Sequence, residues 1–231
     1  MKISAIIPAA GKGKRMGGSV SKQFLSIDDK PVLIHTLERI NSLKIIDEII
    51  LVLPEDKVEW GEKKVKRKYG INKLSKVIKG GKERQDSVYD GLKEVDKNSD
   101  VVVVHDGVRP FFYSKIIKEA IPFLKIFDGV IEALPINDTV KKVSERGIVL
   151  KTLEREKLYR AQTPQIFNYS ILRKAFNRAS DKKYYATDES GLVESIGGKI
   201  KILTGSRYNI KITNPDDLFL AEVIIKNKIF V

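Results

Sequence analysis

The stretch "ISAIIPAAGKGKRMGGSVSKQFL" (residues 3–25) places a glycine-rich, cationic segment directly after a short apolar run. The apolar run is typical of a fully buried strand, and such strands belong to parallel sheets that are covered on both faces. Glycine allows a backbone to approach a ligand closely, and clustered cations repel one another unless an anion lies among them. The stretch therefore predicts a buried strand that leads into a pocket for a small, highly charged anion.

The segments that follow alternate between short apolar runs and apolar residues at helical spacing. The expected strands span residues 47–54, 76–80 and 100–106, and the expected helices span residues 31–43, 61–70 and 84–95. Asp86 or Ser87 is expected to cap the first turn of the last of these helices. The alternation predicts an α/β fold, a three-layer sandwich built on a mostly parallel, twisted sheet. We expect residues 1–231 to form one domain.

One segment interrupts this alternation. From Ile136 to Tyr159, polar and apolar residues alternate on both sides of a turn at Glu145, Arg146 and Gly147. This pattern predicts a β-hairpin rather than a strand–helix unit. An isolated two-stranded ribbon is only marginally stable in water. We therefore expect the hairpin to project as an arm that packs on another surface, and a second subunit is one candidate for that surface.

The composition limits the chemistry of the chain. It has no cysteine and two histidines, which excludes disulfides and thiolate metal sites and argues against a histidine-rich one. No apolar run approaches the length of a membrane span, so we expect a soluble, cytoplasmic protein with no membrane partner. The net charge of +13 arises from 43 basic and 30 acidic residues. The lysines either solubilise the surface or form a nucleic-acid patch. We favour the first interpretation because aromatic residues are not interleaved with the charges.

Three loop motifs are expected at the carboxyl ends of the predicted strands, where open α/β sheets bind their ligands. They are the opening stretch, "GGKERQDS" (residues 80–87) and "HDGVRP" (residues 105–110). The glycines of the opening stretch miss the dinucleotide-binding spacing by one residue, and no P-loop ending follows them. Its cations, which include Arg15 and Lys22, favour a nucleoside triphosphate, because that ligand carries about twice the charge of a dinucleotide pyrophosphate. The alternative is a surface loop with incidental lysines.

Asp106 stands just beyond the apolar run Val101–Val104. An aspartate that faces a phosphate pocket suits Mg²⁺, which takes one or two carboxylates together with phosphate oxygens and water. The alternative, a turn or helix cap, is disfavoured by the nearness of Arg109 and of the glycine loops. His105 has no partner histidine or cysteine nearby in the sequence and is interpreted as structural. The sequence therefore predicts a Mg²⁺ ion near Asp106.

Seven strings resemble the 2-C-methyl-D-erythritol 4-phosphate cytidylyltransferase family, in the right order and over essentially the whole length. They are "AAGKGKRM…KQF", "GGKERQDSV", "VHDGVRP", "DTVK", "QTPQIF", "TDES" and "NIKITNPDDL". The opening Ala9-Ala10-Gly11 is more similar to this family than to the ribitol 5-phosphate cytidylyltransferases, which tend to have Ala-Gly-Gly there. One departure is Ser21, where the family usually has proline before Lys22.

The resemblance implies a Rossmann-like nucleotidyltransferase fold and a homodimer. It also implies an enzyme that condenses CTP with 2-C-methyl-D-erythritol 4-phosphate, with release of pyrophosphate, in isoprenoid precursor biosynthesis. The matching catalytic positions are Arg15, Lys22 and Lys211. The matching nucleotide-binding positions are Ala10, Gly11, Gly13, Gly80, Gly81 and Ser87. The matching acceptor-binding positions are Asp106, Arg109, Thr139, Arg155 and Thr187, and the position of Asp106 also meets the metal.

Two of these positions, Thr139 and Arg155, lie on the predicted arm and match family residues that reach the acceptor of a neighbouring subunit. Two alternatives remain at this point. The acceptor is ribitol 5-phosphate or another polyol phosphate, or the chain is a basic nucleic-acid-binding module on a nucleotide-binding fold. We expect no specific nucleic acid partner, because the basic residues are read as a solvated surface.

Overall fold

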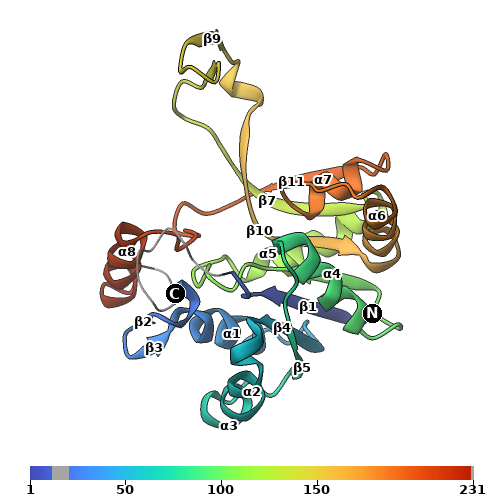
Figure 1. Ribbon diagram of the computed structural model, residues 1–231, viewed down its shortest axis with the longest axis vertical. Helices are drawn as coiled ribbons and strands as arrows, with labels where there is room; N and C mark the ends of the chain where they lie inside the picture. The colour runs from blue at the N-terminus through green and yellow to red at the C-terminus, as the bar shows by residue number, and fades with distance from the viewer. Residues whose placement is uncertain (12–20, 230–231) are drawn as a thin grey trace.

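The computed structural model describes residues 1–11 and 21–229. A seven-stranded sheet runs through the centre of this part of the chain, in the order β11-β7-β10-β6-β1-β4-β5 (Figure 1). Its strands are β1 (Ile3–Pro8), β4 (Glu48–Leu53), β5 (Leu74–Lys79), β6 (Val101–Val104), β7 (Gly129–Pro135), β10 (Tyr159–Asn168) and β11 (Ile200–Thr204). Neighbouring strands are parallel except at β10, which is antiparallel to both β6 and β7. The predicted α/β class and mostly parallel sheet are confirmed.

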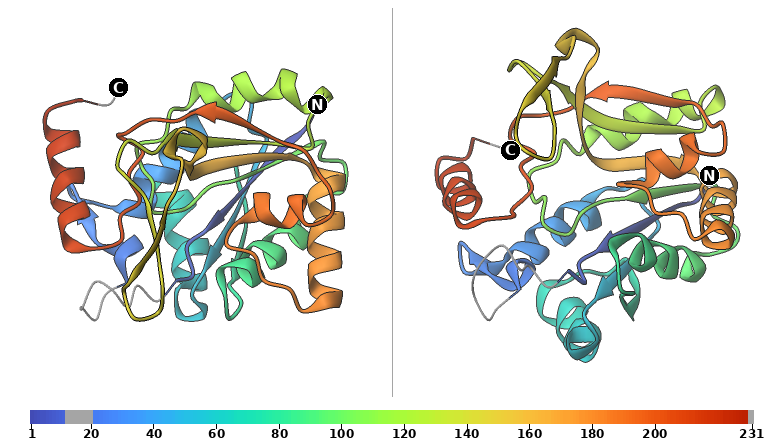
Figure 2. Two further views of the ribbon diagram at one scale, coloured as in Figure 1. Left: turned by 90° about the horizontal axis from the view of Figure 1, so that it is seen from above. Right: turned by 45° about the horizontal axis from the view of Figure 1, so that its top comes forward.

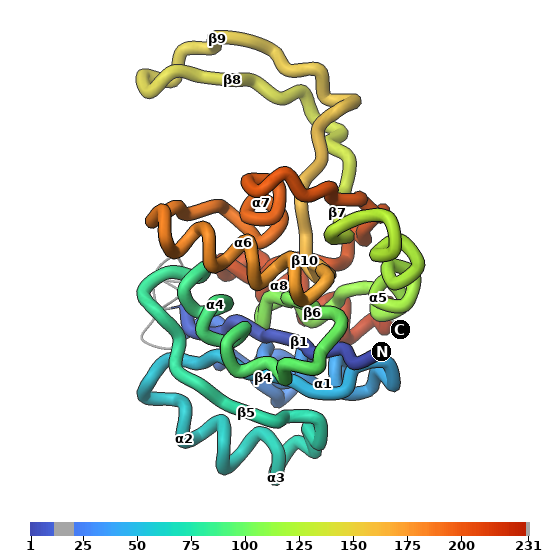
Figure 3. Tube along the Cα trace, turned by 90° about the vertical axis from the view of Figure 1, so that its right-hand side faces the viewer, coloured from blue at the N-terminus to red at the C-terminus, as the bar shows by residue number. Residues whose placement is uncertain are grey.

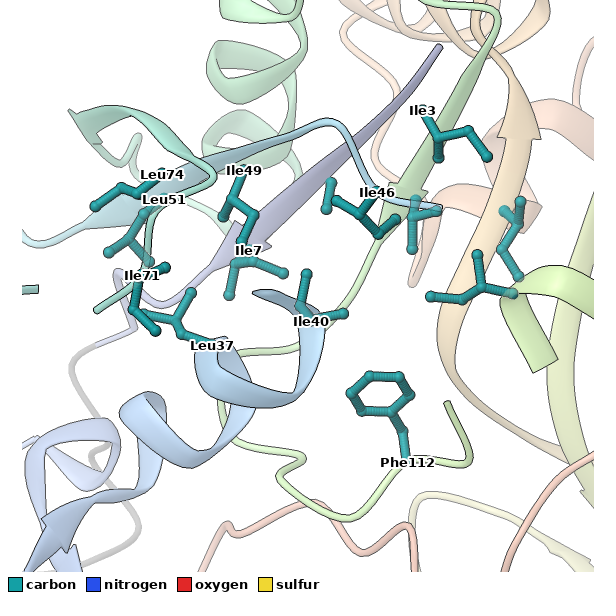
Figure 4. Close-up of a cluster of buried hydrophobic side chains, with 14 of the residues drawn as sticks. Ile3, Ile7, Leu37, Ile40, Ile46, Ile49, Leu51, Ile71, Leu74 and Phe112 are labelled. Atoms are coloured by element: carbon teal, nitrogen blue, oxygen red, sulfur yellow. The ribbon is translucent and has the colours of Figure 1, made fainter. Parts of the chain in front are cut away.

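The central strands are apolar on both sides because helices cover both faces of the sheet. Alternate residues of β1 belong to different clusters, with Ile3, Ala5 and Ile7 on one face and Ile6 on the other. The first face is covered by α1 (Val32–Ser42) and α5 (Lys115–Ala120), and by a helical segment of α2 (Val58–Trp60), η4 (Gly61–Val65) and α3 (Lys66–Tyr69). Figure 4 shows the cluster that β1 and β4 form with α1 on this face.

The second face is covered by α4 (Arg84–Glu94), α6 (Tyr169–Lys182) and α7 (Glu189–Glu194). The sequence of α6 explains its packing, since Leu172, Ala175, Phe176 and Ala179 recur at helical spacing and are all buried. Gly91 allows α4 to approach the sheet closely, because a Cβ at this position would lie 2.7 Å from Ile6 Cγ2. These contacts complete the third layer of the sandwich.

The expected capping of the first turn of α4 is confirmed for Asp86, although neither Asp86 nor Ser87 is the N-cap residue. Glu83 is the N-cap residue of α4, and Asp86 lies at the third position of the helix. There the Asp86 carboxylate accepts a hydrogen bond of 3.0 Å from the backbone N–H of Glu83. The Ser87 hydroxyl donates to the Glu83 carbonyl at 3.1 Å. The reciprocal hydrogen bonds of this capping box therefore begin at Glu83, before the residues that N-cap preferences indicate.

A third cluster joins α8 (Pro215–Lys226) to the body through Ile27, Val108, Phe111 and Ile212. Figure 2 shows α8 at the edge of the body beside the short strands β2 (Ser26–Ile27) and β3 (Lys30–Pro31). The remaining short helices are η2 (Lys22–Phe24), η3 (Glu55–Lys57) and η5 (Ile121–Lys125). Within the described ranges, no helix is long and apolar enough to cross a membrane.

The predicted hairpin is present and projects as an arm between β7 and β10 (Figures 1 and 3). It contains the antiparallel strands β8 (Lys141–Val143) and β9 (Val149–Thr152), followed by η6 (Arg155–Lys157). The turn lies where the sequence predicts it, because Gly147 has a φ of 77° and donates to the Ser144 carbonyl at 3.0 Å. Both sides of the arm leave many apolar residues in solvent, including Ile148 at 62% and Leu150 at 60% exposure.

Candidate active site

The carboxyl ends of β1, β5 and β6 meet at one edge of the sheet, and the loops that follow them enclose a cleft of about 700 Å³. The residues that line it are Pro8, Ala9, Ala10, Gly11, Lys22, Gln23, Gly81, Lys82, Glu83, Arg84, Ser87, Asp106, Val108 and Lys211. Most of the residues predicted to bind nucleotide or to act on it are therefore in one place. Arg15 and Gly13 lie outside the described residues.

The glycine loop after β5 packs tightly against the loop after β1. A Cβ at Gly80 would lie 2.3 Å from the Ala10 Cβ and 2.7 Å from the Ser87 hydroxyl. A Cβ at Gly81 would lie 2.4 Å from the Asp86 Cβ. A larger side chain at Gly80 would separate the two loops, and one at Gly81 would press on the first turn of α4. Glycine is therefore required here for close approach, as the sequence indicated.

Gln23 holds the end of the opening stretch against β1. Its buried side-chain amide donates to the Ala9 carbonyl at 2.7 Å and to the Gly11 carbonyl at 3.0 Å. Lys22 precedes it in η2 and lines the cleft. Sequence reasoning missed Gln23, although it falls in the string "KQF" that carried the resemblance. The bonds of Gln23 fix the turn on which Lys22 stands.

Asp106 is the centre of the charged part of the cleft. Its carboxylate receives Arg84 Nε at 3.1 Å, Arg109 Nε at 3.4 Å and Lys211 Nζ at 2.8 Å. Burial alone would raise the pKa of Asp106, but the three cations outweigh it and hold this pKa well below its usual range. A permanently ionised carboxylate with three cations leaves the site with an excess of positive charge, which suits a polyanion.

Arg84 and Glu189 form a second ion pair that sequence reasoning missed. The Arg84 guanidinium binds Glu189 through two bonds of 2.7 and 3.1 Å, and Glu189 is 1% exposed at the start of α7. Paired forks of this kind fix the planes of both groups. Arg84 is thereby held between Glu189 and Asp106. Glu189 lies 105 residues from Arg84 along the chain, so local spacing does not predict the pair. The available signal is that the two residues fall in the strings "GGKERQDSV" and "TDES".

Thr187 lies beside this pair but not in the main cleft. It is exposed and lines a neighbouring cleft of about 410 Å³, which shares Lys82, Glu83 and Arg84 with the first. Arg109 is bound more deeply, since its Nη1 donates to the Asn209 carbonyl at 2.8 Å. His105 is buried, and its ring nitrogens lie 3.0 Å from the Arg109 carbonyl and 3.0 Å from the Thr163 hydroxyl. Burial lowers the pKa of His105 to about 4, which fits its structural interpretation.

The two predicted arm residues are not brought to the cleft of the same chain. Thr139 and Arg155 are exposed, and the arm that carries them stands away from the body (Figure 1). Arg155 donates to the Asn137 carbonyl at 2.8 Å and lies 3.8 Å from a carboxylate oxygen of Glu156. These contacts are local to the arm, and Arg155 does not line the cleft of its own chain.

The predicted metal has to be tested against the donors present. Among the described residues, no group of three or more histidine, aspartate or glutamate side chains could hold an ion. Asp106 offers one carboxylate, and both of its oxygens are engaged by cations. Mg²⁺ commonly takes one or two carboxylates and completes its shell with phosphate oxygens and water. The donor set fits a metal that arrives with a nucleotide, not a resident ion in a protein cage.

Comparisons with known proteins point to one family. Residues 3–227 match the family described as 2-C-methyl-D-erythritol 4-phosphate cytidylyltransferase. A protein of that name from Syntrophus aciditrophicus is 43% identical over 227 residues, which are 98% of this chain and 97% of the relative. One from Clostridium botulinum is 45% identical over 225 residues, which are 97% of this chain and 98% of the relative.

A solved structure has the same fold. The 4-diphosphocytidyl-2C-methyl-D-erythritol synthase from Anaerococcus prevotii superposes with a TM-score of 0.86 at 32% identity. The superposition covers 97% of this chain and 96% of that one. Sequence and fold therefore lead to the same result: the chain belongs to the 2-C-methyl-D-erythritol 4-phosphate cytidylyltransferase family.

Proposed function

We propose that this member of the family transfers the cytidylyl group of CTP to 2-C-methyl-D-erythritol 4-phosphate, giving 4-diphosphocytidyl-2-C-methyl-D-erythritol and pyrophosphate. The observation that carries the proposal is the convergence of Arg84, Arg109 and Lys211 on the buried Asp106, beside the glycine loops of the cleft. Family membership over residues 3–227 supports the choice of substrates. The product belongs to isoprenoid precursor synthesis, and we place the reaction in the cytoplasm, where CTP is available.

The reaction needs no base. A phosphate oxygen of the acceptor attacks the α-phosphorus of CTP, and the bond from that phosphorus to the bridging oxygen breaks as pyrophosphate leaves with the electron pair. The second pKa of a phosphate monoester is near 6, so the nucleophile is largely dianionic at neutral pH. The obstacle is repulsion between two polyanions, which positioning and positive charge overcome. The cleft offers such charge in Lys22, Lys82, Arg84 and Lys211.

Each group of residues has a separate task in this proposal. Ala10, Gly11 and the loop at Gly80 and Gly81 hold the nucleotide through their backbones, with Ser87 beside them. Lys22, together with Arg15 outside the described residues, stabilises the triphosphate while charge moves onto pyrophosphate. Lys211 and Arg109 receive the acceptor phosphate, and Thr187 binds the acceptor from the neighbouring cleft. Asp106 orients Lys211 and Arg109, because it contacts both.

In the same proposal, Asp106 is the residue that would hold Mg²⁺ when the nucleotide is bound. When bound, the ion neutralises phosphate charge and polarises the α-phosphate. Asp106 is suited to it because its low pKa keeps the carboxylate ionised throughout the physiological range. Most of the remaining ligands have to come from phosphate and water, given the donors described above.

We propose further that the active protein is a homodimer whose arms complete the partner's acceptor sites. The support is the hairpin, which projects from the body (Figure 3), together with the exposure of its Ile148, Leu150 and Arg155. A guanidinium at Arg155 would bind a phosphate through two parallel bonds. The contact between Arg155 and Glu156, at 3.8 Å, is too long for a hydrogen bond and leaves the guanidinium able to bind a phosphate.

Mixed subunits test the shared site. Arg155→Ala and Lys22→Ala homodimers should each be nearly inactive. Heterodimers formed by exchange have one intact site and one doubly damaged site, so the mixture should recover up to roughly a quarter of native activity. The control is each variant mixed with itself under the same conditions. Absence of recovery, with exchange demonstrated by differently tagged chains, would show that each site is built from a single chain.

Turnover tests the function itself. The full chain is assayed for pyrophosphate release with CTP, Mg²⁺ and one acceptor at a time. We expect 2-C-methyl-D-erythritol 4-phosphate to be used with a far higher kcat/KM than ribitol 5-phosphate. A preference for ribitol 5-phosphate would replace the acceptor in the proposal. No turnover with either, together with salt-resistant retention of one defined nucleic acid, would overturn the enzyme assignment.

A further inference from the structure

A buried polar cluster lies behind the cationic part of the cleft. Its centre is Glu132, which is on β7 and is fully buried. Opposite Glu132, the ladder between β7 and β10 is irregular, with a shift in register between Ala161 and Gln165. Gln162 and Thr163 lie in this irregular segment, and both are buried. A buried carboxyl group among amides is costly unless it has a specific task or specific partners.

The partners of Glu132 hold the turn that follows β11. One carboxyl oxygen accepts the backbone N–H of Ser206 at 3.1 Å, and the other accepts the Asn209 side-chain amide at 2.9 Å. The Asn209 amide also donates to the Thr163 carbonyl at 2.8 Å. From the other side, the Gln162 amide donates to the carbonyls of Ser206 and Asn209, each at 3.0 Å. Both ends of the turn are therefore fixed by buried bonds.

This turn leads directly to the charged site. The Asn209 carbonyl that accepts from Gln162 also accepts from Arg109 Nη1, at 2.8 Å. Two residues further along the chain, Lys211 reaches the Asp106 carboxylate at 2.8 Å. One turn thus sets the positions of two of the three cations around Asp106. A shift of this turn would move both cations together.

We propose that Glu132, acting through Gln162 and Asn209, is a positioning residue for the acceptor phosphate. It fixes the turn over residues 206–209 so that Arg109 and Lys211 converge on one anion. Glu132 itself does not line the cleft. The inference rests on the proposed function, because it assigns the convergence of these cations to the acceptor.

A carboxylic acid is the side chain that this cluster requires. Both oxygens of Glu132 receive donors, while the buried Gln162 Oε1 and Asn209 Oδ1 have no hydrogen-bond partner among the described residues. Among side chains of this size, a carboxyl group accepts on two oxygens, whereas an amide accepts on one. Burial raises the pKa of Glu132 to about 7. Arg109 is the charged residue that acts on Glu132 from a neighbouring element. When Glu132 is protonated it carries no charge, so it does not compete with a phosphate for Arg109.

Gly205 supports the same interpretation. A Cβ at this position would lie 2.2 Å from Gln162 Oε1 and 3.1 Å from a carboxyl oxygen of Glu132. The backbone of the turn is therefore pressed directly onto these two side chains. Gly205 lies directly against both side chains, so a change at Glu132 is expected to pass into the turn.

The experiment is steady-state kinetics on Glu132→Gln and Gln162→Met. In Glu132→Gln, one of the two donors loses its acceptor, because an amide nitrogen cannot accept. In Gln162→Met, the carbonyls of Ser206 and Asn209 lose their donor. Each variant should raise the KM for 2-C-methyl-D-erythritol 4-phosphate about tenfold, because a small misplacement of oriented groups has effects of this size. The KM for CTP should change little.

The control is Ser4→Ala, which breaks a buried polar network at the opposite end of the sheet, where the Ser4 hydroxyl lies 2.6 Å from Glu48 and 2.5 Å from Ser99. Wild-type turnover is measured first, so its absence would refute the proposed function and not this inference. With wild-type turnover present, equal changes in both KM values would refute the inference, as would the same pattern in Ser4→Ala. Failure of both Glu132→Gln and Gln162→Met to fold would also refute it, because the cluster would then be a requirement of folding alone.

Discussion

Replacing Asp106 with asparagine tests the electrostatic centre of the site directly. The substitution keeps the shape of the side chain and removes its charge. In the wild type, three cations lie at 2.8 to 3.4 Å from the Asp106 carboxylate. Of these three cations, Arg84 keeps its ion pair with Glu189 in Asp106→Asn. Arg109 and Lys211 are then left beside each other around a neutral amide, and the folded state is destabilised by the unpaired charge.

The expected loss can be worked out from these distances. A pair of unit charges about 3 Å apart in a medium of effective permittivity of about 20 attracts by roughly 5 kcal/mol. Desolvation of the buried carboxylate offsets much of this gain, and removal of one partner from a buried pair costs about 3–5 kcal/mol. Arg84 and Lys211 are 31% and 35% exposed, so solvent screens part of the effect. We therefore expect the free energy of unfolding to fall by about 3 kcal/mol.

Urea unfolding at neutral pH, with and without pyrophosphate, measures this loss. Pyrophosphate should stabilise Asp106→Asn more than the wild type, because the anion replaces the missing charge and binds the folded state. The matched control is Asp90→Asn, which removes an exposed partner of Lys93 and should leave stability almost unchanged. An Asp106→Asn protein as stable as the wild type would refute the reasoning. Equal stabilisation of the two proteins by pyrophosphate would do so as well.

Three further predictions concern turnover and pH. Lys22→Ala should lower kcat at saturating CTP by orders of magnitude, since it removes charge stabilisation that grows in the transition state; a raised KM with native kcat would contradict that role. Chelation should abolish turnover and added Mg²⁺ should restore it, whereas full activity in excess chelator would exclude the proposed metal. As pH falls from 7 to 4.5, His105 lowers the free energy of unfolding by about 2 kcal/mol, because its pKa is about 4 in the folded state instead of 6.5. Over the same interval Glu132 raises the free energy of unfolding by about as much, because its pKa is about 7 in the folded state instead of 4.5. The two contributions offset each other in the wild type. Glu132→Gln should therefore become less stable by about 2 kcal/mol over this interval in urea unfolding, and a pH-independent variant would contradict the pKa of His105.

The sequence predicted those parts of the fold that depend on local patterns. The run Val101–Val104 is a buried central strand because four successive valines suit a strand covered on both faces. Gly147 marked the turn of the arm because its positive φ favours glycine. The direction of β10 could not be predicted in the same way. Its residues carry no signal for antiparallel pairing, which follows from the return of the chain through the arm.

The candidate site was predicted only in part for a related reason. Loop glycines and cations are visible in the sequence, and the structure brings Lys22, Asp106 and Lys211 to one cleft. The partners that orient these side chains are distant in the chain, as Glu189 is from Arg84. Pairing over such separations depends on tertiary packing and not on local spacing. The catalytic and binding roles of the site residues remain predictions until the variants are measured.

The arm has a consequence for how this architecture can be rebuilt. It leaves the sheet at Pro135 and returns at Tyr159, and these two residues pair directly. The backbone N–H of Ile136 donates to the Leu158 carbonyl at 3.1 Å, which closes the base of the arm. Because the two ends are already held together, a change in the length between them alters the closure entropy only slowly. The segment is modular, because it can be exchanged for a short turn or for another hairpin without changing the register of the seven strands. Such an exchange would remove the reach into a partner subunit that we propose for the arm.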